Sequence, residues 1–401
     1  MTKPRVLILC PYFLPGEQGG GSVRAVVNLI EHLGADFDFV VGTGAHDLNS
    51  QHPYRAQQQL KTRATTGLDI RYLPRGLPLW GVLRALLAEP WDLVYFNSFL
   101  SPRYTALPLL LRRFGRRHGV PALLAPRGEL MQGSMQHRWL RKWVYLIMLR
   151  TAGLLDGLVF HATSQAEAAE MAALGLSPVL LAADLPPRPA KDLVPLQSPP
   201  PGPLRLAFVA RLDPNKNLGF ALRTLALIRV PLQFDIIGPV GRADYWRQCQ
   251  QLIAALPSHV QVRYLGALPH DQVMSALGRC EMFFFPSQAE NNGYVILEAL
   301  LAGCVLLISD RTPWRGLADL GVGLDLVLDN EQTFAAAIDA FARLPEALRL
   351  EQRWRAQIYG LSRLEARQEV DAMQALLQQA IARAYPNSCM RRTSSSHSGA
   401  T

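Results

Sequence analysis

Cysteine, lysine and long hydrophobic runs are all scarce in this sequence. Only 5 of its 401 residues are cysteines, and they are scattered without metal-ligand spacing, which argues against a disulfide framework and indicates a reducing compartment. The longest apolar stretches, such as residues 143–149, fall far short of the roughly 18 residues of a membrane-spanning helix. The apolar stretch after Arg5 is too short for a secretory signal peptide. We therefore expect a cytoplasmic protein.

Apolar residues and arginine are what the sequence has in quantity. Hydrophobic residues make up 49 % of the chain and charged residues 18 %, which excludes disorder over most of its length and leaves room for two or three domains. The formal net charge is +9, and residues 103–150 account for all of it with ten basic residues and one acid, Glu129. Such a segment is typical of a solvated helix face, an anionic membrane surface or a site for a phosphate-bearing ligand. Nucleic acid is not expected, because no nucleic-acid-binding motif accompanies the charge.

Short apolar runs alternate with helical stretches in both halves of the chain. Near-continuous apolar runs are typical of parallel strands that helices cover on both faces. The expected strands are residues 5–10, 37–42, 91–96, 121–125 and 158–162 in the first half and 206–210, 234–238, 260–265, 282–285, 305–308 and 324–328 in the second. The predicted fold class is therefore α/β, with two Rossmann-like parallel-sheet domains facing across a cleft.

A proline-rich segment separates the two halves. It cannot form a helix or a central strand, because proline lacks the donor N–H. We predict a first domain at 1–185, a linker at 186–203, a second domain at 204–362, a C-terminal helix at 363–386 with the first domain as its candidate packing partner, and a disordered tail at 387–401.

The first candidate ligand loop is the glycine-rich stretch 15–22, which leaves the first strand and enters a helix. Ligands of open parallel sheets bind at the carboxyl ends of the strands. Glycines there let an anion or a sugar approach the backbone N–H groups at the helix N-terminus. The glycines do not fit the G-x-G-x-x-G pattern, which argues against a nicotinamide dinucleotide. A purely structural turn is the alternative.

Arg211 and Lys216 occupy the matching position after the first strand of the second half. Arginine supplies a planar fork of donors and lysine a point charge, and together they can bracket a diphosphate. Lys216 is one of only five lysines in the chain, so composition alone does not explain its presence here.

The strongest pattern lies in residues 285–303. A strand ends, a turn carries Glu290, and a helix begins near Asn292 or Gly293, so that its first N–H groups favour an anion or sugar hydroxyls. Glu298, between one and two turns along this helix, can reach a ribose diol, while Glu290 can reach the sugar. Two solvated carboxylates beside a core helix would explain Glu298 but not the Glu-Asn-Asn-Gly turn.

The spacing of Glu290 and Glu298, with Arg211 and Lys216 before it, resembles the retaining glycosyltransferases of family 4, which have the GT-B fold. The resemblance covers nearly the whole chain. Segments 92–99, 125–130, 161–167 and 309–314 resemble a branch that assembles bacterial surface polysaccharides. The resemblance implies that a sugar moves from a nucleotide-sugar donor to a glycan or polyprenyl-pyrophosphate-linked acceptor in cell-surface polysaccharide biosynthesis, with its anomeric configuration kept.

The resemblance also implies roles for individual residues. Arg211 and Lys216 would hold the donor diphosphate and neutralise the departing phosphate, and Glu290 would bind the donor sugar. The other implied donor-binding residues are Gly19, Gly20, Gly238, Asn292, Gly293, Tyr294, Val295 and Glu298, and the acceptor-side residues are Asn97, Arg127 and Glu129. A same-face transfer assisted by the leaving phosphate is the favoured mechanism, and a two-step mechanism through a carboxylate is the alternative.

We expect no cofactor and no catalytic metal. Residues 36–38 spell D-x-D, a metal-diphosphate signature of the other glycosyltransferase fold, but they open an apolar strand far in sequence from Arg211 and Lys216, so we interpret them as structural.

Two departures from the family pattern stand out. Many relatives carry a histidine where this chain has Asn97, and His161, inside an apolar run, is interpreted as a core histidine and not as its substitute. The Asn-Gly pair that relatives have before the linker is replaced here by residues 181–186. Two other functions stay open: a sugar-nucleotide epimerase of the same architecture and a catalytically inactive nucleotide-sugar-binding protein.

The resemblance also implies a function for the basic segment 103–150. Its arginines and lysine, interleaved with aromatic residues, would rest on the anionic inner face of the cytoplasmic membrane and admit a lipid-pyrophosphate acceptor. The residues in question are Arg112, Arg113, Arg116, Arg117, Arg138, Arg141, Lys142, Trp139, Trp143 and Tyr145.

Overall fold

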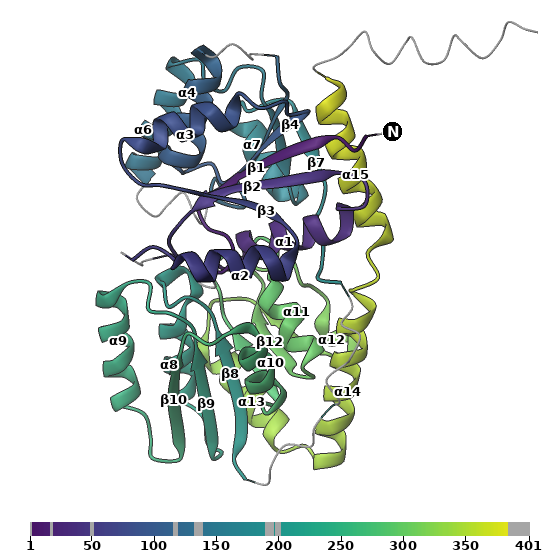
Figure 1. The fold of residues 1–401 in the computed structure, drawn as a ribbon. Coiled ribbons are helices and arrows are strands. Elements are labelled where there is room, and N and C mark those ends of the chain that lie inside the picture. Colours follow the sequence, from purple (N-terminus) through teal and green to yellow (C-terminus); the bar gives the residue numbers. More distant parts are fainter. Residues whose placement is uncertain are drawn as a thin grey trace, which may run out of the picture. The chain divides into compact units, whose positions relative to one another are not determined.

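The chain forms two compact units, residues 1–185 with 366–401 and residues 186–365 (Figure 1). The computed structural model describes residues 2–16, 19–48, 52–114, 119–131, 139–188, 196 and 202–383. Most of the predicted linker at 186–203 and the whole predicted tail at 387–401 lie outside this range. Each unit is built around one parallel sheet.

The sheet of the first unit has seven strands in the order β3-β2-β1-β4-β5-β6-β7, all paired in parallel. Its strands are β1 (Arg5–Cys10), β2 (Asp38–Gly44), β3 (Asp69–Leu73), β4 (Leu93–Asn97), β5 (Ala122–Ala125), β6 (Val159–Ala162) and β7 (Val179–Leu181). The five predicted strands are confirmed to within a few residues. The two that the sequence did not indicate, β3 and β7, are the edge strands.

Helices cover both faces of this first sheet. They are α1 (Gly21–Leu33), α2 (Ala56–Thr66), α3 (Pro78–Leu87), α4 (Leu107–Phe114), α6 (Trp139–Thr151), α7 (Gln165–Ala173) and α15 (Arg367–Ala382), with one π-helical turn at Pro102–Ala106. One core joins Leu83 of α3, Leu109 of α4 and Leu146 of α6. The other joins Leu29 of α1 to Leu377 of α15. No helix of the described residues has both the length and the apolar character to cross a membrane.

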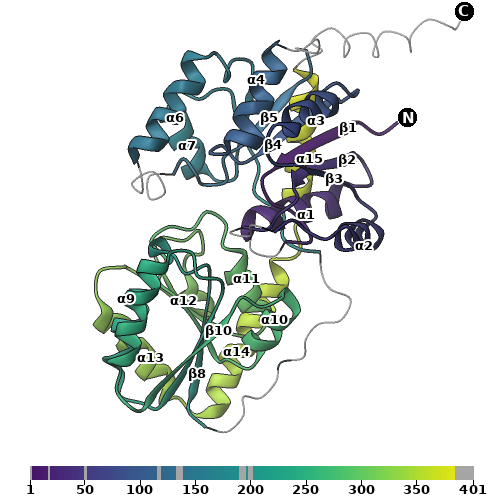
Figure 2. The same cartoon turned by 60° about the vertical axis from the view of Figure 1, so that its left-hand side comes forward.

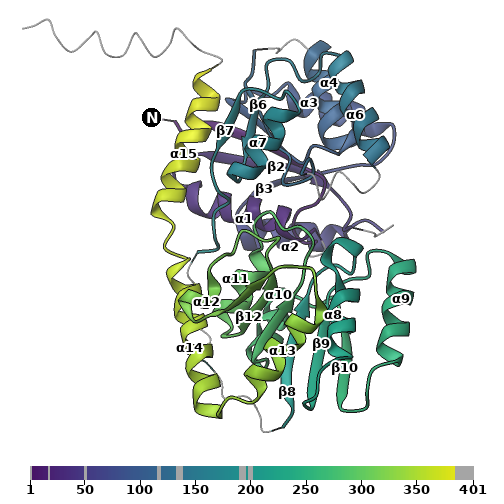
Figure 3. The same ribbon diagram turned by 180° about the vertical axis from the view of Figure 1, so that it is seen from behind.

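Helix α15 belongs to the first unit although it follows the second in sequence (Figure 3). It buries Met373, Leu376, Leu377 and Ala380 against the same core as α1. The predicted C-terminal helix thus begins at Arg367, four residues later than expected, and its apolar stripe is what holds it on this unit.

The second unit has a six-stranded parallel sheet in the order β10-β9-β8-β11-β12-β13. Its strands are β8 (Leu204–Val209), β9 (Leu232–Ile237), β10 (Val260–Gly266), β11 (Met282–Phe285), β12 (Val305–Ser309) and β13 (Gly323–Leu326). All six correspond to predicted strands. Each of them lies within two residues of its predicted bounds at both ends.

Helices enclose this second sheet as well. They are a 3₁₀ turn at Pro214–Lys216, α8 (Leu218–Leu225), α9 (Ala243–Ala254), α10 (His270–Gly278), α11 (Tyr294–Leu301), α12 (Leu317–Leu320), α13 (Glu331–Ala342) and α14 (Glu346–Ser362). Figure 2 shows α9 and α13 on one side of the strands and α10, α11 and α14 on the other. Arg353 of α14 is fully buried and donates to the carbonyl oxygens of Gly303 (3.0 Å) and Gly278 (3.2 Å), so α14 is tied to the helices beside it.

The strand order reverses once in each sheet, and this decides where a ligand can sit. The reversal lies between β1 and β4 in the first sheet and between β8 and β11 in the second. At such a switch point the loops that leave the two strands diverge to opposite faces and leave a crevice at the carboxyl edge. Residues 11–16, 19–20 and 98–101 leave the first switch point, and residues 210–217 and 286–293 leave the second.

Candidate functional site

Lys216 and Glu290 meet at the switch point of the second sheet. Lys216 ends the 3₁₀ turn after β8, and Glu290 lies in the loop after β11. The Lys216 Nζ is 2.5 Å from the Glu290 Oε2 and 5.5 Å from the centroid of the Phe285 ring. The two side chains keep 21 % and 17 % of their surface exposed. A cation and a carboxylate are therefore in direct contact at this edge, and both remain within reach of solvent.

Backbone hydrogen bonds fix the loops that carry this pair. The Gln288 N–H (2.8 Å) and the Ser287 hydroxyl (3.2 Å) both donate to the carbonyl oxygen of Asn215, which joins the loop after β11 to the loop after β8. The Glu290 N–H donates to the carbonyl oxygen of Arg311 (3.1 Å) in the loop after β12. The three loops thus hold the charges of Lys216 and Glu290 in a defined position.

The start of α11 lies directly beside Glu290. Its N-cap, Gly293, has a φ of 75°, and a Cβ there would lie 2.9 Å from the Ile296 Cδ1 and 3.0 Å from the Trp314 Nε1. Trp314 in turn donates from Nε1 to the carbonyl oxygen of Asn292 (2.9 Å). Only glycine fits this turn, because a side chain would meet both a strained backbone and a filled space.

This helix start presents donors. Tyr294 and Val295 open α11, where the first N–H groups of a helix have no intrahelical acceptor. The Nδ2 of Asn292 is buried and finds no hydrogen-bond partner among the residues that the structure describes. An unpaired buried donor costs free energy unless a ligand satisfies it, so this position favours a ligand with acceptor oxygens.

Glu298 lies one turn further along α11. Its Oε1 is 3.5 Å from the Nδ1 of His270, the first residue of α10, and its side chain is 18 % exposed. The sequence did not point to His270. Glu298 therefore lies next to the N-terminal residue of α10. The predicted contact of Glu298 with a ribose stays a prediction.

Arg211 and Gly238 mark the loops after β8 and β9. Arg211 is exposed and pairs with Asp213, not with Glu290. Gly238 has a φ of 135°, and a Cβ there would lie 1.9 Å from the carbonyl oxygen of Ala210. Its N–H donates to the carbonyl oxygen of Gly266 (2.7 Å). The loops after β8, β9 and β10 therefore pack together around a position where no side chain can be placed.

At the switch point of the first sheet, Asn97 contacts the glycine-rich loop. Gly20 is the N-cap of α1 with a φ of 62°, and a Cβ on Gly19 would lie 2.4 Å from the Val23 Cγ2. Asn97, the last residue of β4, donates from Nδ2 to the carbonyl oxygen of Ser22 (3.2 Å). The end of β4 thus holds the start of α1.

Arg127 is fully engaged inside the first unit. It donates from Nε to the Asn97 Oδ1 (2.7 Å) and from Nη2 to the Tyr95 hydroxyl (2.8 Å), and it forms an ion pair with Asp184 through Nη1. The side chains of Arg127 and Asp184 are only 7 % and 5 % exposed. The geometry therefore gives Arg127 a role in positioning Asn97, and its expected contact with an acceptor stays a prediction.

His161 completes this network. Its Nε2 is 2.8 Å from the carbonyl oxygen of Ala182, which can only accept, so Nε2 carries the proton and Nδ1 accepts from the Tyr95 hydroxyl at 2.7 Å. Burial and the nearby charge of Arg127 lower the pKa of His161 to about 3. The prediction of a core histidine is confirmed, because the side chain is fully buried.

Glu129 supports the loop after β4. It accepts hydrogen bonds from the Ser98 hydroxyl (2.8 Å) and from the backbone N–H groups of Phe99 (2.6 Å) and Leu100 (2.7 Å). Burial raises the pKa of this carboxyl group. These three donors give Glu129 a structural role here, and its acceptor contact remains untested.

The sequence reasoning missed Asp184 and Glu167. Asp184 pairs with Arg127, and Glu167 accepts from the N–H of Gly128 (2.6 Å) and the N–H of Thr163 (2.8 Å). Both follow the ends of strands, β7 and β6. That position was the one signal that could have identified them, since Arg127 and Gly128, the partners that they hold, lie far away in the sequence.

The D-x-D segment lies away from these edges. Asp38 is the first residue of β2, at the amino edge of the sheet, and pairs with Arg5 at 3.5 Å. Among the residues described here, no three His, Cys, Asp or Glu side chains come together in a group that could hold a metal ion. Asp38 thus has a structural partner on β1.

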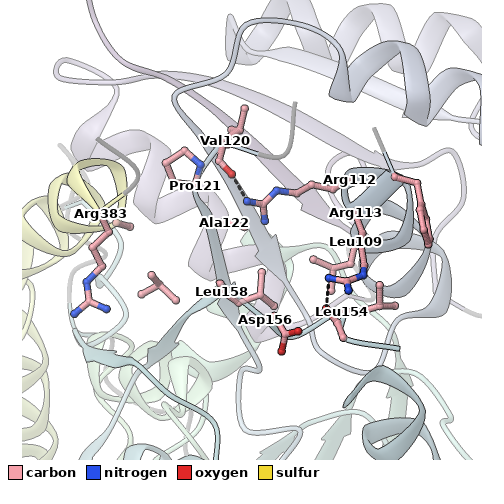
Figure 4. A pocket seen from close by; sticks show the side chains of 16 residues that line it. Leu109, Arg112, Arg113, Val120, Pro121, Ala122, Leu154, Asp156, Leu158 and Arg383 are labelled. Carbon is pink, nitrogen blue, oxygen red and sulfur yellow. Dashed lines mark hydrogen bonds between the residues drawn. The ribbon is translucent and has the colours of Figure 1, made fainter. Parts of the chain in front are cut away.

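A pocket of about 630 Å³ lies at the amino ends of β5 and β6 (Figure 4). Arg112, Arg113, Arg383 and Asp156 are among its lining residues. Arg112 donates to the carbonyl oxygen of Val120. This pocket lies at the edge of the first sheet opposite to its switch-point loops, so it contains none of the predicted site residues.

Family models match both units. Residues 196–361 match the model described as glycosyl transferases group 1, and residues 20–183 match the model described as a glycosyl transferase 4-like domain. None of the curated proteins compared with the chain matches it in sequence.

Solved structures match nearly the whole chain. Anabaena HepE, crystallised with UDP and glucose, is 18 % identical over 94 % of this chain and 100 % of its own, with a TM-score of 0.69. Sucrose-phosphate synthase from Thermosynechococcus elongatus is 18 % identical over 95 % and 100 %, with a TM-score of 0.70. WaaG, a glycosyltransferase involved in lipopolysaccharide biosynthesis, is 14 % identical over 92 % and 98 %, with a TM-score of 0.62. These likenesses establish the GT-B fold.

Proposed function

Because the chain is a group 1 glycosyltransferase of GT-B fold by its two matched domains, we propose that it is a retaining enzyme of family 4. Its donor is a nucleotide sugar, and its acceptor is a glycan or a polyprenyl-pyrophosphate-linked glycan. The observation that carries this proposal is the contact of Lys216 with Glu290 at the switch point of the second sheet, beside the start of α11. The complex of HepE with UDP-glucose supports a nucleoside diphosphate sugar as the donor class.

The diphosphate of the donor would bind at the Lys216 side of this pair. Lys216 keeps part of its surface exposed and can add a phosphate oxygen to its contact with Glu290. Arg211 is 46 % exposed and can turn from Asp213 toward the same group. The N–H groups at the start of α11 and the Asn292 amide add donors, so negative charge is favoured here.

Transfer breaks the bond between the anomeric carbon and the leaving phosphate oxygen. Negative charge grows on the diphosphate as this bond breaks, and Lys216 and Arg211 stabilise that charge. The acceptor hydroxyl attacks from the same face, and the leaving phosphate takes its proton, so the anomeric configuration is kept. Glu290, which contacts Lys216, would accept hydrogen bonds from donor-sugar hydroxyls. Attack by a carboxylate in a first step is the alternative route.

We also propose that the enzyme acts in cell-surface polysaccharide biosynthesis at the cytoplasmic face of the membrane. The family-like motifs in both halves support this role, and WaaG, which shares the fold, is involved in lipopolysaccharide biosynthesis. The basic segment 103–150 supports contact with an anionic membrane surface.

The test is donor turnover by the purified protein. The chain is incubated with UDP-, GDP-, ADP- and dTDP-sugars, with and without glycan and polyprenyl-pyrophosphate acceptors, and released nucleotide is measured. Lys216→Ala and Glu290→Ala are expected to lower turnover at least about 100-fold. The matched control is Glu331→Ala, which removes the partner of Arg223 from an exposed ion pair in the same unit and is expected to leave turnover unchanged.

Two results would contradict the proposal. Donor binding without turnover under every acceptor condition would favour an inactive nucleotide-sugar-binding protein. Conversion of one sugar nucleotide into its epimer without acceptor would favour an epimerase.

A further inference from the structure

The pocket at the amino ends of β5 and β6 is built from both faces of the first sheet (Figure 4). Leu109 of α4 and Leu158, just before β6, belong to one hydrophobic core, and Ala380 of α15 belongs to the other. The volume of about 630 Å³ is within the range of sites for small organic molecules. None of the residues of the proposed donor site lines this pocket, so the proposed function does not account for it.

Arginine side chains line the pocket from two sides. Figure 4 shows Arg112 and Arg113 of α4 on one side and Arg383, which follows α15, on the other. Asp156 is the one carboxylate among the described lining residues. Three guanidinium groups and one carboxylate leave two positive charges beside apolar walls. A pocket of this composition favours an anion that also carries an apolar part.

Arg112 has an unpaired donor here. Its Nε is buried and has no hydrogen-bond partner in the described part of the chain. Its Nη2 donates to a neutral group, the carbonyl oxygen of Val120, and Arg113 likewise donates to the carbonyl oxygen of Gly153 (3.3 Å). Burial lowers the pKa of Arg112 to about 10, because removal from water disfavours the charged form. An anion in the pocket would satisfy the unpaired N–H and offset the charge.

The basic segment 103–150 is therefore not one uniform charged face. Arg112 and Arg113 line the pocket, whereas Lys142 turns inward, with its Nζ 3.5 Å from the carbonyl oxygen of Glu129. Three further arginines of the segment lie outside the described residues: Arg116, Arg117 and Arg138.

We propose that this pocket binds a small phosphate monoester, with its phosphate at the Arg112 guanidinium and its organic part against the apolar walls. A phosphate monoester carries nearly two negative charges at neutral pH, which matches the two positive charges of the pocket. A carboxylate would offset only one of them. Arginine also matches the geometry of phosphate oxygens through paired hydrogen bonds. The inference goes beyond the proposed function and does not depend on it.

The experiment is isothermal titration of the full-length protein with phenyl phosphate, inorganic phosphate and benzyl alcohol at constant ionic strength. Phenyl phosphate is expected to bind most tightly, because among the three it alone combines a dianion with an apolar group. Arg112→Gln is expected to weaken this binding at least about tenfold. Its thermal unfolding is measured alongside, since Arg112 also holds Val120.

Two exposed residues provide variants with little risk to folding. Arg383→Gln is expected to weaken the binding of phenyl phosphate about threefold, and Asp156→Asn is expected to strengthen it about threefold. The two substitutions change the charge of the pocket by one unit in opposite directions.

Two controls locate the bound anion. Arg367→Gln changes an exposed arginine at the other end of α15, about 24 Å away along the helix, and it is expected to bind phenyl phosphate like the wild type. Lys216→Met is also expected to leave this binding unchanged, because Lys216 lies in the second unit and not in the pocket. Donor turnover, measured on the same samples, reports separately on the proposed function.

Two kinds of result would overturn the inference. One is binding of phenyl phosphate that Arg112→Gln, Arg383→Gln and Asp156→Asn leave unchanged, or that Lys216→Met abolishes, since the anion would then bind elsewhere. The other is a wild-type protein that does not bind phenyl phosphate saturably. In that case, binding of phosphatidic acid vesicles that Arg112→Gln abolishes would identify a lipid headgroup, and not a soluble monoester, as the ligand.

Discussion

At the switch point of the first sheet, Arg127 has three partners within its own unit, the side chains of Asn97, Tyr95 and Asp184. At the switch point of the second sheet, Lys216 pairs with Glu290 and both side chains remain partly exposed. The two edges have the same topology, and the difference lies in how their charges are used. A buried charge whose hydrogen-bonding groups are all paired within the protein holds the loops in place. A charge that remains accessible to solvent can bind a ligand.

The largest effect on stability is expected from removing Arg127, whose partners all lie inside the first unit. Arg127→Met leaves Asp184 buried without a cation, and this should lower the free energy of unfolding by about 3–5 kcal/mol. The measurement is chemical unfolding, with hydrogen exchange of the β4 and β5 amides to locate the loss in the first unit. The double variant Arg127→Met with Asp184→Leu should recover a large part of it, because no uncompensated charge then remains.

A matched variant tests whether burial is the cause. Arg223→Met removes an arginine whose ion pair with Glu331 leaves 53 % of its side chain exposed, and it should cost no more than about 1 kcal/mol. Equal losses for Arg127→Met and Arg223→Met would contradict the distinction between the two kinds of charge.

The same buried network should make stability depend on pH. The pKa of His161 is lowered to about 3 in the folded protein, whereas an unfolded chain has a histidine pKa of about 6.5. Between these values the unfolded state binds one more proton, so stability falls as pH falls, by at most about 1.4 kcal/mol per pH unit. His161→Gln should remove this dependence, as measured by unfolding at pH 7, 6 and 5. An NMR signal of His161 that titrates above pH 5 would show that the expectation is wrong.

The central strands were predictable because they are covered on both faces. Runs such as Arg5–Cys10 and Met282–Phe285 are almost wholly apolar, and the structure confirms them. The edge strands β3 and β7 were missed, because Asp69–Leu73 alternates polar with apolar residues and Val179–Leu181 has only three residues. The edge strands of the second sheet, β10 and β13, were predicted, so the alternation of β3 and the shortness of β7 explain why these two were missed.

The individual site residues could be predicted from the sequence, but the contacts between their side chains could not. Lys216 and Glu290 were identified because each follows an apolar run. Their direct contact depends on β8 pairing with β11, which are not consecutive in sequence. The ion pair of Arg127 with Asp184 depends on β5, β6 and β7 lying side by side in the first sheet. Such contacts follow from sheet order, which local patterns do not encode.

Two glycine-to-alanine variants test how backbone conformation affects stability in the first unit. Gly20 has a positive φ with no atom near a Cβ, so Gly20→Ala should cost about 1–2 kcal/mol through backbone strain alone. Gly81 lies inside α3, also with open space around a Cβ but without a positive φ. Gly81→Ala should stabilise by about 0.5–1 kcal/mol. Thermal unfolding measures both, and a stabilising Gly20→Ala would contradict the conformation assigned to the glycine-rich loop.

The smallest effect on stability is expected where the effect on function should be largest. Lys216→Met removes the cation from a pair that water still reaches, so unfolding should change by less than about 1 kcal/mol. Donor turnover should nevertheless fall strongly, because Arg211, which pairs with Asp213, is then the one cation left in this loop to neutralise the leaving phosphate. Calorimetry and released nucleotide are measured on the same sample. A loss of stability as large as that of Arg127→Met would mean that Lys216, too, serves the architecture, and the contrast between the two edges would then not hold.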